Sequence, residues 1–263
     1  MAHSARLFDY LLGGKDNFAV DRAVGEAIKA AVPGVPMMVR ANREWMLRVT
    51  RFLTRQAGIR QFLDIGTGIP TTPNLHQAAQ GIAPHCRVVY VDNDPLVLAH
   101  ARALLTSDPR GRCEYVDADL RDIDQILTSP ALAGTLDLTQ PVAIVLASVL
   151  MLLTDDDNPT AIVAKVRDWA PPGSYLAISH PTADLDPDAM AAIVDITTSS
   201  GMTFVPRSQE QVTEMFGDWD LVEPGLVPVL AWRPQAPPDD PEAAYYWTGV
   251  ARQTSRPARP GVI

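Results

Sequence analysis

The sequence has 263 residues and a net charge of −9, with 47% apolar and 20% charged residues. This length and composition fit a globular chain that forms one large domain or a domain with an extension. The acidic balance and the lack of a basic cluster argue against a nucleic-acid substrate, which requires a basic face. No apolar run approaches the roughly 20 residues that span a membrane, and the first residues lack an apolar signal core. We therefore expect a cytoplasmic protein with a small-molecule partner and without a membrane partner.

The two cysteines, Cys86 and Cys113, do not have the spacing of a metal site. We interpret them as thiols of a protein in a reducing compartment and expect no bound metal.

The first 60 residues have helical patterns only. Apolar residues recur at helical spacing in residues 4–12, in residues 21–31 and from Arg40 to about residue 57. Gly13-Gly14, Pro33-Gly34 and Gly58 mark the helix ends. These patterns predict a helical N-terminal cap, residues 1–60, that joins residues 61–263 in one compact unit.

From Gln61 onwards, short apolar runs alternate with helical patterns. We expect strands at 61–65, 87–91, 113–116, 142–150 and 174–179, and helices that include 74–82, 95–105 and a segment from residue 187. Two strand-like segments, 220–232 and 245–251, flank a proline-rich loop and fit an antiparallel edge. The order predicts an α/β fold with a doubly wound, mostly parallel seven-stranded sheet and an antiparallel edge strand.

A glycine turn follows the first expected strand. Gly66 and Gly68, on either side of Thr67, let the backbone approach a ligand closely. Asp64 stands at the end of an apolar strand, where an unpaired carboxylate is costly to bury, so a polar or cationic ligand is expected there. A nicotinamide-dependent oxidoreductase is one hypothesis for such a turn. Thr71 argues against it, because it occupies the third glycine position of the dinucleotide fingerprint.

The Asp-x-Gly-x-Gly pattern resembles motif I of class I S-adenosylmethionine (SAM) methyltransferases. In that family the loop lies against the amino-acid end of SAM, which carries an ammonium group. The resemblance therefore implies that the cofactor site includes Asp64, Gly66, Thr67 and Gly68. Pro70 departs from the pattern, since a third glycine often stands there.

Further acids follow the second and third expected strands. Asp92, next to Asn93, has the spacing of an acid that accepts hydrogen bonds from ribose hydroxyls. The alternative is a turn acid that caps the next helix, but Asp94 already fills that position. In SAM enzymes the carboxylate at the place of Asp119, with the backbone of Leu120, commonly binds adenine; an acid-rich turn is the alternative.

Small residues end the fourth expected strand. Ala147 and Ser148 would leave room beside the SAM sulfonium, although the packing of a buried strand explains them equally well.

Several segments together are similar to an actinobacterial family of SAM-dependent methyltransferases that was long catalogued as a domain of unknown function. The similarity runs from about Arg6 to about Arg252. It implies a Rossmann-like class I fold with a helical N-terminal cap, SAM as cofactor, S-adenosylhomocysteine (SAH) as product, and no particular acceptor. The segments that carry it are Tyr10-Leu11-Leu12-Gly13-Gly14-Lys15-Asp16-Asn17-Phe18, Arg40-Ala41-Asn42-Arg43, residues 62–68, residues 89–95 and Ala118-Asp119-Leu120-Arg121.

One stretch departs from this family. Many relatives carry a Leu-His-His-like stretch after the fourth strand, where this chain has Leu150-Met151-Leu152-Leu153. Met151 and Leu152 would then form an apolar wall. The absence of these histidines is compatible with a non-catalytic SAM-binding regulator, which is the alternative to an enzyme.

The hypothesis for the mechanism is in-line methyl transfer to an unidentified small molecule, with a general base needed only if the acceptor is protonated. We expect Arg40 or Arg43 to pair with the SAM carboxylate, unless both only cover a helix surface. Asn17 and Tyr10 would form a lid, with helix packing as the alternative for Tyr10. His180 is the candidate base, and an ordinary loop histidine is the alternative.

Overall fold

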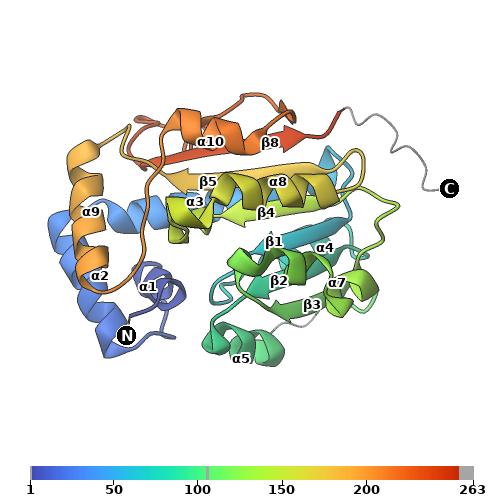
Figure 1. Cartoon of the computed structure of the whole chain (residues 1–263), viewed down its shortest axis with the longest axis horizontal. Helices are drawn as coiled ribbons and strands as arrows, with labels where there is room; N and C mark the ends of the chain where they lie inside the picture. Colours follow the sequence, from blue (N-terminus) through green and yellow to red (C-terminus); the bar gives the residue numbers. More distant parts are fainter. Residues whose placement is uncertain (1, 105–106, 255–263) are drawn as a thin grey trace.

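Three helices precede the sheet in the computed structural model, which describes residues 2–104 and 107–254 (Figure 1). They are α1 (Ser4–Leu11), α2 (Ala19–Ala31) and α3 (Val35–Arg55). The rest of the described chain forms β1 (Gln61–Ile65), α4 (Leu75–Gln80), β2 (Arg87–Asp92), α5 (Pro95–Leu104), β3 (Arg112–Asp117), η1 (Leu120–Asp122), α6 (Ile123–Leu127), α7 (Pro130–Thr135), β4 (Ala143–Ala147), η2 (Leu150–Leu152), η3 (Asp155–Asp157), α8 (Pro159–Trp169), β5 (Tyr175–Pro181), α9 (Pro187–Ser199), α10 (Gln209–Phe216), β6 (Asp220–Leu221), β7 (Val227–Pro228) and β8 (Tyr246–Arg252).

The strands form one sheet in the order β3-β2-β1-β4-β5-β8-β6, and β7 also pairs with β8. The first five strands of this order are parallel, and β8 is antiparallel to β5. The expected doubly wound, mostly parallel sheet with an antiparallel edge is confirmed. It has eight strands because the segment predicted as one strand at 220–232 provides two strands of two residues each, β6 and β7.

The chain reverses its direction of winding between β1 and β4, which lie side by side in the sheet. Strands β2 and β3 extend the sheet to one side of β1, and β5 extends it beyond β4. Open α/β sheets bind ligands at this switch point, beyond the carboxyl ends of the strands. The fold therefore directs attention to the residues that follow β1, β2, β3 and β4.

Alternate residues of the central strands pack into two separate cores. Phe62, Ala143 and Ala177 belong to the core under α3 and α4, whereas Leu63 and Ile144 belong to the core under α8 and α10. All five residues are fully buried, as expected for strands that are covered on both faces. On the α3 side, α1 packs against α2, and α2 packs against α9 (Figure 1).

Some boundaries differ from the sequence prediction. Helix α3 begins at Val35 rather than Arg40, with Pro36 in its first turn, a position that proline tolerates. Strand β5 continues through Pro181 and so includes His180. Leu105 of the predicted helix 95–105, and residues 255–263 of the predicted second part, lie outside the described residues.

Within residues 2–104 and 107–254, no helix combines the length and the apolar character that crossing a membrane requires. The same residues contain no group of three or more His, Cys, Asp or Glu side chains placed to hold a metal ion.

Candidate active site

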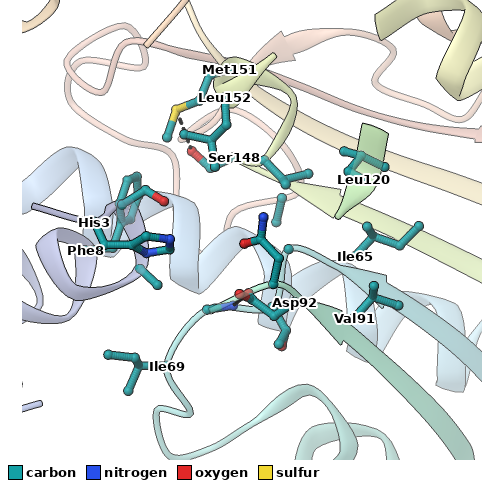
Figure 2. Close-up of a pocket in the computed structure, with 18 of the residues that line it drawn as sticks. His3, Phe8, Ile65, Ile69, Val91, Asp92, Leu120, Ser148, Met151 and Leu152 are labelled. Atoms are coloured by element: carbon teal, nitrogen blue, oxygen red, sulfur yellow. Dashed lines mark hydrogen bonds between the residues drawn. The ribbon is translucent and has the colours of Figure 1, made fainter. Parts of the chain in front are cut away.

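A cavity of about 390 Å³ lies beyond the carboxyl ends of β1, β2, β3 and β4 (Figure 2). The residues that follow these strands form one side of it. Helices α1 and α3, the η2 segment and the loop after α9 form the other side. The cavity thus occupies the switch point of the sheet, with the N-terminal helices across from the strand ends.

The carboxylate of Asp64 is buried at the end of β1. Strand alternation turns it toward the α3 side of the sheet, and its exposed fraction is 5%. Burial raises the pKa of Asp64 to about 6, although a hydrogen bond from Thr67 Oγ1 (3.1 Å) and the charge of Arg43 act in the opposite direction. The protein thus holds an acid whose ionised form lacks a full set of partners.

Arg43 connects α3 to the loop after β1. Its guanidinium donates to the backbone carbonyls of Thr71 and Pro73, and Arg43 lines the cavity. Burial lowers its pKa, while the charge of Asp64 raises it. The neighbouring Asn42 also lines the cavity, and its Oδ1 is buried without a hydrogen-bond partner among the described residues. This side of the cavity therefore offers a cation and an unused acceptor.

Both glycines of the turn have positive φ, +75° for Gly66 and +66° for Gly68, but their surroundings differ. A Cβ on Gly66 would lie 2.3 Å from Val149 Cγ2, whereas a Cβ on Gly68 would meet nothing within 4 Å. Gly66 is needed for the contact between the β1 turn and the segment after β4. The backbone at Gly68 stays open toward the cavity.

Asp92 ends β2 and lines the cavity with 9% of its surface exposed. Its two oxygens accept hydrogen bonds from the backbone N–H groups of Gly68 (2.8 Å) and Asp94 (3.0 Å). Burial raises its pKa, and these two hydrogen bonds lower it. The cap of α5 is made by Asp94, whose Oδ1 accepts from the N–H of Leu96 (2.9 Å). Asp94, and not Asp92, therefore caps α5, as the sequence predicted.

The end of β3 places Asp119 and Leu120 at the same cavity. Asp119 accepts hydrogen bonds from Asn93 Nδ2 (2.8 Å) and from the backbone and side chain of Arg121 (2.9 and 2.8 Å). Its carboxylate remains 29% exposed. The side chain of Asn93, which follows Asp92 in the chain, thus connects the end of β2 to Asp119.

Ala147 and Ser148 line the cavity where β4 ends. Ser148 has a φ of +59°, an uncommon conformation for a residue with a side chain. Its Oγ donates to Tyr246 Oη (3.1 Å), and its N–H donates to Ser179 O (3.0 Å). These bonds hold the residue in place, and such local strain tends to occur at functional sites.

The N-terminal segment is tied to the rim of the cavity. His3 Nδ1 lies 2.9 Å from Asp94 Oδ2, and Arg6 forms ion pairs with both Asp94 (3.1 Å) and Asp21 (3.0 Å). His3 and Phe8 face the strand ends across the cavity in Figure 2. These contacts fasten α1 over the site.

Three of the expected residues do not line the cavity. Tyr10 turns toward α2, where its hydroxyl contacts Glu26 and its ring packs on Gly25. Asn17 donates to Asp9 Oδ2 (2.7 Å), and it is Asp9 that lines the cavity. Arg40 is exposed on α3. Of the two arginines considered for the same role, Arg43 is the one at the cavity.

His180 also lies away from the cavity, because β5 is longer than expected. It pairs with Trp247 of β8 inside the sheet and has no exposed surface. Its Nδ1 bonds to Pro181 O (2.9 Å), and its Nε2 bonds to the Arg207 guanidinium (3.2 Å). Burial lowers its pKa to about 3. His180 is therefore part of the buried packing of β5, and it does not lie where it could take a proton from a ligand in the cavity.

Sequence reasoning missed several residues that line the cavity. Asp9 carried a signal, since it is an acid among the apolar residues of an amphipathic helix and would need a partner if buried. Met202 and Thr203 carried none, because they belong to a loop that only the tertiary fold brings to α1.

The chain matches a methyltransferase family over nearly its whole length. A family model described as S-adenosyl methyltransferase matches residues 1–254. A DUF574 family protein from Streptomyces avermitilis is 44% identical, with a TM-score of 0.93 over 96% of this chain and 97% of that one. A methyltransferase candidate from Thermobifida fusca is 39% identical, with a TM-score of 0.89 over 97% of this chain and 96% of that one.

The fold is also shared more widely. The N-methyltransferase NodS from Bradyrhizobium japonicum, solved with SAH, is 16% identical, with a TM-score of 0.50 over 95% of this chain and 100% of that one. A likeness at this identity concerns the fold alone. No curated protein matches the sequence.

Proposed function

Because this chain belongs to the S-adenosyl methyltransferase family, we propose that SAM binds along the strand ends and that its methyl group passes in line to a small-molecule acceptor. The chain is a SAM-dependent methyltransferase with a Rossmann-like class I fold. The observation that supports this placement best is the row of Asp64, Asp92 and Asp119. These acids lie at the carboxyl ends of three neighbouring parallel strands and line one cavity.

The residues present fit SAM. Asp64 is buried and has a raised pKa, so a ligand ammonium would supply the partner that its ionised form lacks. Asn42 Oδ1 is a buried acceptor without a partner among the described residues, and Arg43 is a cation beside it. A ligand with both an ammonium and a carboxylate matches these three side chains. Asp92 and Asp119 are acceptors for the ribose and adenine groups.

When bound, SAM supplies an electrophilic methyl carbon on a sulfonium. The protein contributes position and environment. Asp64 holds the amino-acid end, Asp92 fixes the ribose, and the small side chains of Ala147 and Ser148 leave space beside the reacting carbon. Helix α1, fastened through Arg6 to Asp94, limits the entry of water. His180 is buried in β5, away from the cavity, and has no role as a base in this mechanism.

The division into a helical cap, residues 1–60, and a SAM-binding domain, residues 61–263, belongs to the same proposal. Helices α1 and α2 support it, because they pack on one another beside the cavity. Helix α3 joins both parts, since Trp45, Val49 and Leu53 are fully buried in the core that also contains Phe62 of β1.

Calorimetric titration of the purified protein with SAM, SAH and NAD tests the proposal. We expect SAM and SAH to bind with one-to-one stoichiometry and NAD not to bind. Binding of NAD alone would contradict the interpretation of Asp64. Formation of SAH when candidate acceptors are added would distinguish the enzyme from a SAM-binding regulator, which would bind SAM without turnover.

A further inference from the structure

A second, smaller cavity of about 30 Å³ adjoins the first. It lies among α1, α2, α3, α9 and β8, and Phe8, Val39, Met151, Leu152 and Met202 line both cavities. Figure 2 shows Met151 and Leu152 on one side of the main cavity and Phe8 on another. Only a few side chains therefore separate the two spaces, and the unbranched side chains of Met151 and Met202 can change rotamer readily. We call the smaller space the apolar branch.

The apolar branch offers nothing to a charged group. Its lining includes no Asp, Glu, Lys, Arg or His among the described residues. Ile28, Met38 and Ile193 line it with 2–3% of their surface exposed. Two of the four hydroxyls in its lining have protein partners: Thr197 Oγ1 donates to Ile193 O (2.7 Å), and Tyr246 Oη accepts from Ser148 Oγ (3.1 Å). The other two, of Ser4 and Thr203, belong to residues that also line the main cavity. An ion placed there would lose its hydration and meet no side chain of opposite charge.

The branch lies on the reacting side of the proposed cofactor position. Ser148 lines the main cavity, and its hydrogen-bond partner Tyr246 lines the branch. Asp92 and Asp119, which are proposed to bind ribose and adenine, do not line the branch. An acceptor aligned with the methyl carbon beside Ser148 would therefore have one end directed into the branch.

We propose that the apolar branch is the acceptor subsite, and that the acceptor is an uncharged small molecule whose short alkyl end enters it. The proposal rests on the proposed function, because it takes the reacting carbon to lie near Ser148. At about 30 Å³ the branch has room for two or three carbon atoms rather than for a whole molecule. The nucleophilic end of the acceptor then lies in the main cavity, beside the cofactor.

The first test uses 4-alkylphenols with tails from methyl to butyl, titrated calorimetrically into the complex of the full chain with SAH. We expect the affinity to rise about fourfold for each methylene that enters the branch, and to level off after propyl. Tyramine, which carries an ammonium on a tail of similar length, is expected to bind at least tenfold more weakly than 4-propylphenol. A flat alkyl series, or equal binding of tyramine, would overturn the proposal.

The second test fills the branch. Thr197→Leu adds bulk, and Thr197→Val removes the same hydroxyl without adding bulk, so the two variants form a matched pair. We expect Thr197→Leu to bind 4-propylphenol at least tenfold more weakly than Thr197→Val, with equal affinities for SAH. Equal affinities for 4-propylphenol would overturn the proposal.

A third variant covers the case in which Thr197→Leu does not fold. Ile193→Val enlarges the branch by one methylene, and the affinity is then expected to level off at butyl rather than propyl. An unchanged plateau would count against the proposal. The SAH titration keeps the two hypotheses apart, because a protein that fails to bind SAH contradicts the proposed function. If SAH does not bind, the 4-alkylphenol series measured on the protein without SAH still tests the apolar branch.

Discussion

The strand-end side and the helical side of the main cavity are built differently. On the strand-end side, Asp64, Asp92 and Asp119 extend from strands whose register is set by the sheet. On the helical side, Phe8, Val39 and Met46 are apolar, and Arg6 of α1 forms an ion pair with Asp94 at the rim. In the proposed placement the strand ends, together with Asn42 and Arg43 of α3, would bind the polar cofactor groups, whereas the apolar residues of the helices would face the acceptor.

The strand-end side is expected to be the less tolerant of change, and Gly66→Ala is the most severe test. The left-handed backbone costs about 1 kcal/mol, and the contact with Val149 adds about 1–3 kcal/mol, so we expect a loss of about 2–4 kcal/mol in the free energy of unfolding. Chemical denaturation measures it.

Gly68→Ala is the control for this prediction, since it has the same sign of φ but no neighbour within 4 Å. We expect it to cost about 1 kcal/mol. If both variants lose equal stability, the packing of the β1 turn against Val149 is not what requires a glycine.

Asp92→Ala tests the proposed ribose contact. A hydrogen bond to a charged acceptor contributes about 1.5–3 kcal/mol, so we expect the affinity for SAM to fall about 100-fold. Calorimetry measures the affinity, and circular dichroism verifies the fold. Asp117→Ala is the matched control, because Asp117 pairs with Asp92 in the sheet register but is exposed and does not line the cavity. Similar losses in both variants would refute the assignment.

The raised pKa of Asp64 predicts that SAM binding depends on pH. The ammonium of SAM requires an ionised Asp64, so the affinity should fall about tenfold per pH unit below about 6, and binding near pH 6 should release a proton. Titrations between pH 5 and 8 in buffers of different ionisation enthalpy measure both effects.

Asp64→Asn serves as the control for the pH dependence. The variant should bind SAM weakly without a slope near pH 6. In the free protein the folded-state pKa lies above the unfolded value, so the wild type loses stability as the pH rises from about 4 to 6. The variant lacks this loss, so its free energy of unfolding at pH 8 should exceed that of the wild type by about 1–3 kcal/mol. A slope that persists in the variant would assign the titration to another group.

His180→Ala should have the smallest effect on the cavity. We expect the affinity for SAH to change less than twofold, because His180 lies inside the sheet between β4 and β8. The free energy of unfolding should fall by about 2–4 kcal/mol, since the change leaves a gap and removes a partner of the buried Arg207. A large loss of SAH affinity at unchanged stability would contradict this placement.

The difference between the two sides also explains what the sequence could predict. Strand ends are predictable because an apolar run followed by an acid places that acid at one edge of a parallel sheet, and the ends of β1, β2 and β3 all line the cavity as expected. His180 was misplaced because β5 continues two residues beyond its predicted end, into pairing with β8.

The helical side was less predictable, because a helical pattern gives the period of the buried face but not which neighbour covers it. Tyr10 turns to α2 and Arg40 to the surface, although Arg43 on the same helix reaches the cavity. Met202 reaches α1 through a loop some two hundred residues away in the chain, and no local pattern indicates such a contact.

A crystal structure of the protein with SAH tests the central claim most directly. We expect the ribose hydroxyls within hydrogen-bond distance of Asp92, adenine beside Asp119 and Leu120, and the amino group of SAH at Asp64. Extra density for an added 4-alkylphenol would then lie between Ser148 and Ile193. SAH bound away from the three acids, or reversed so that adenine meets Asp64, would contradict the account.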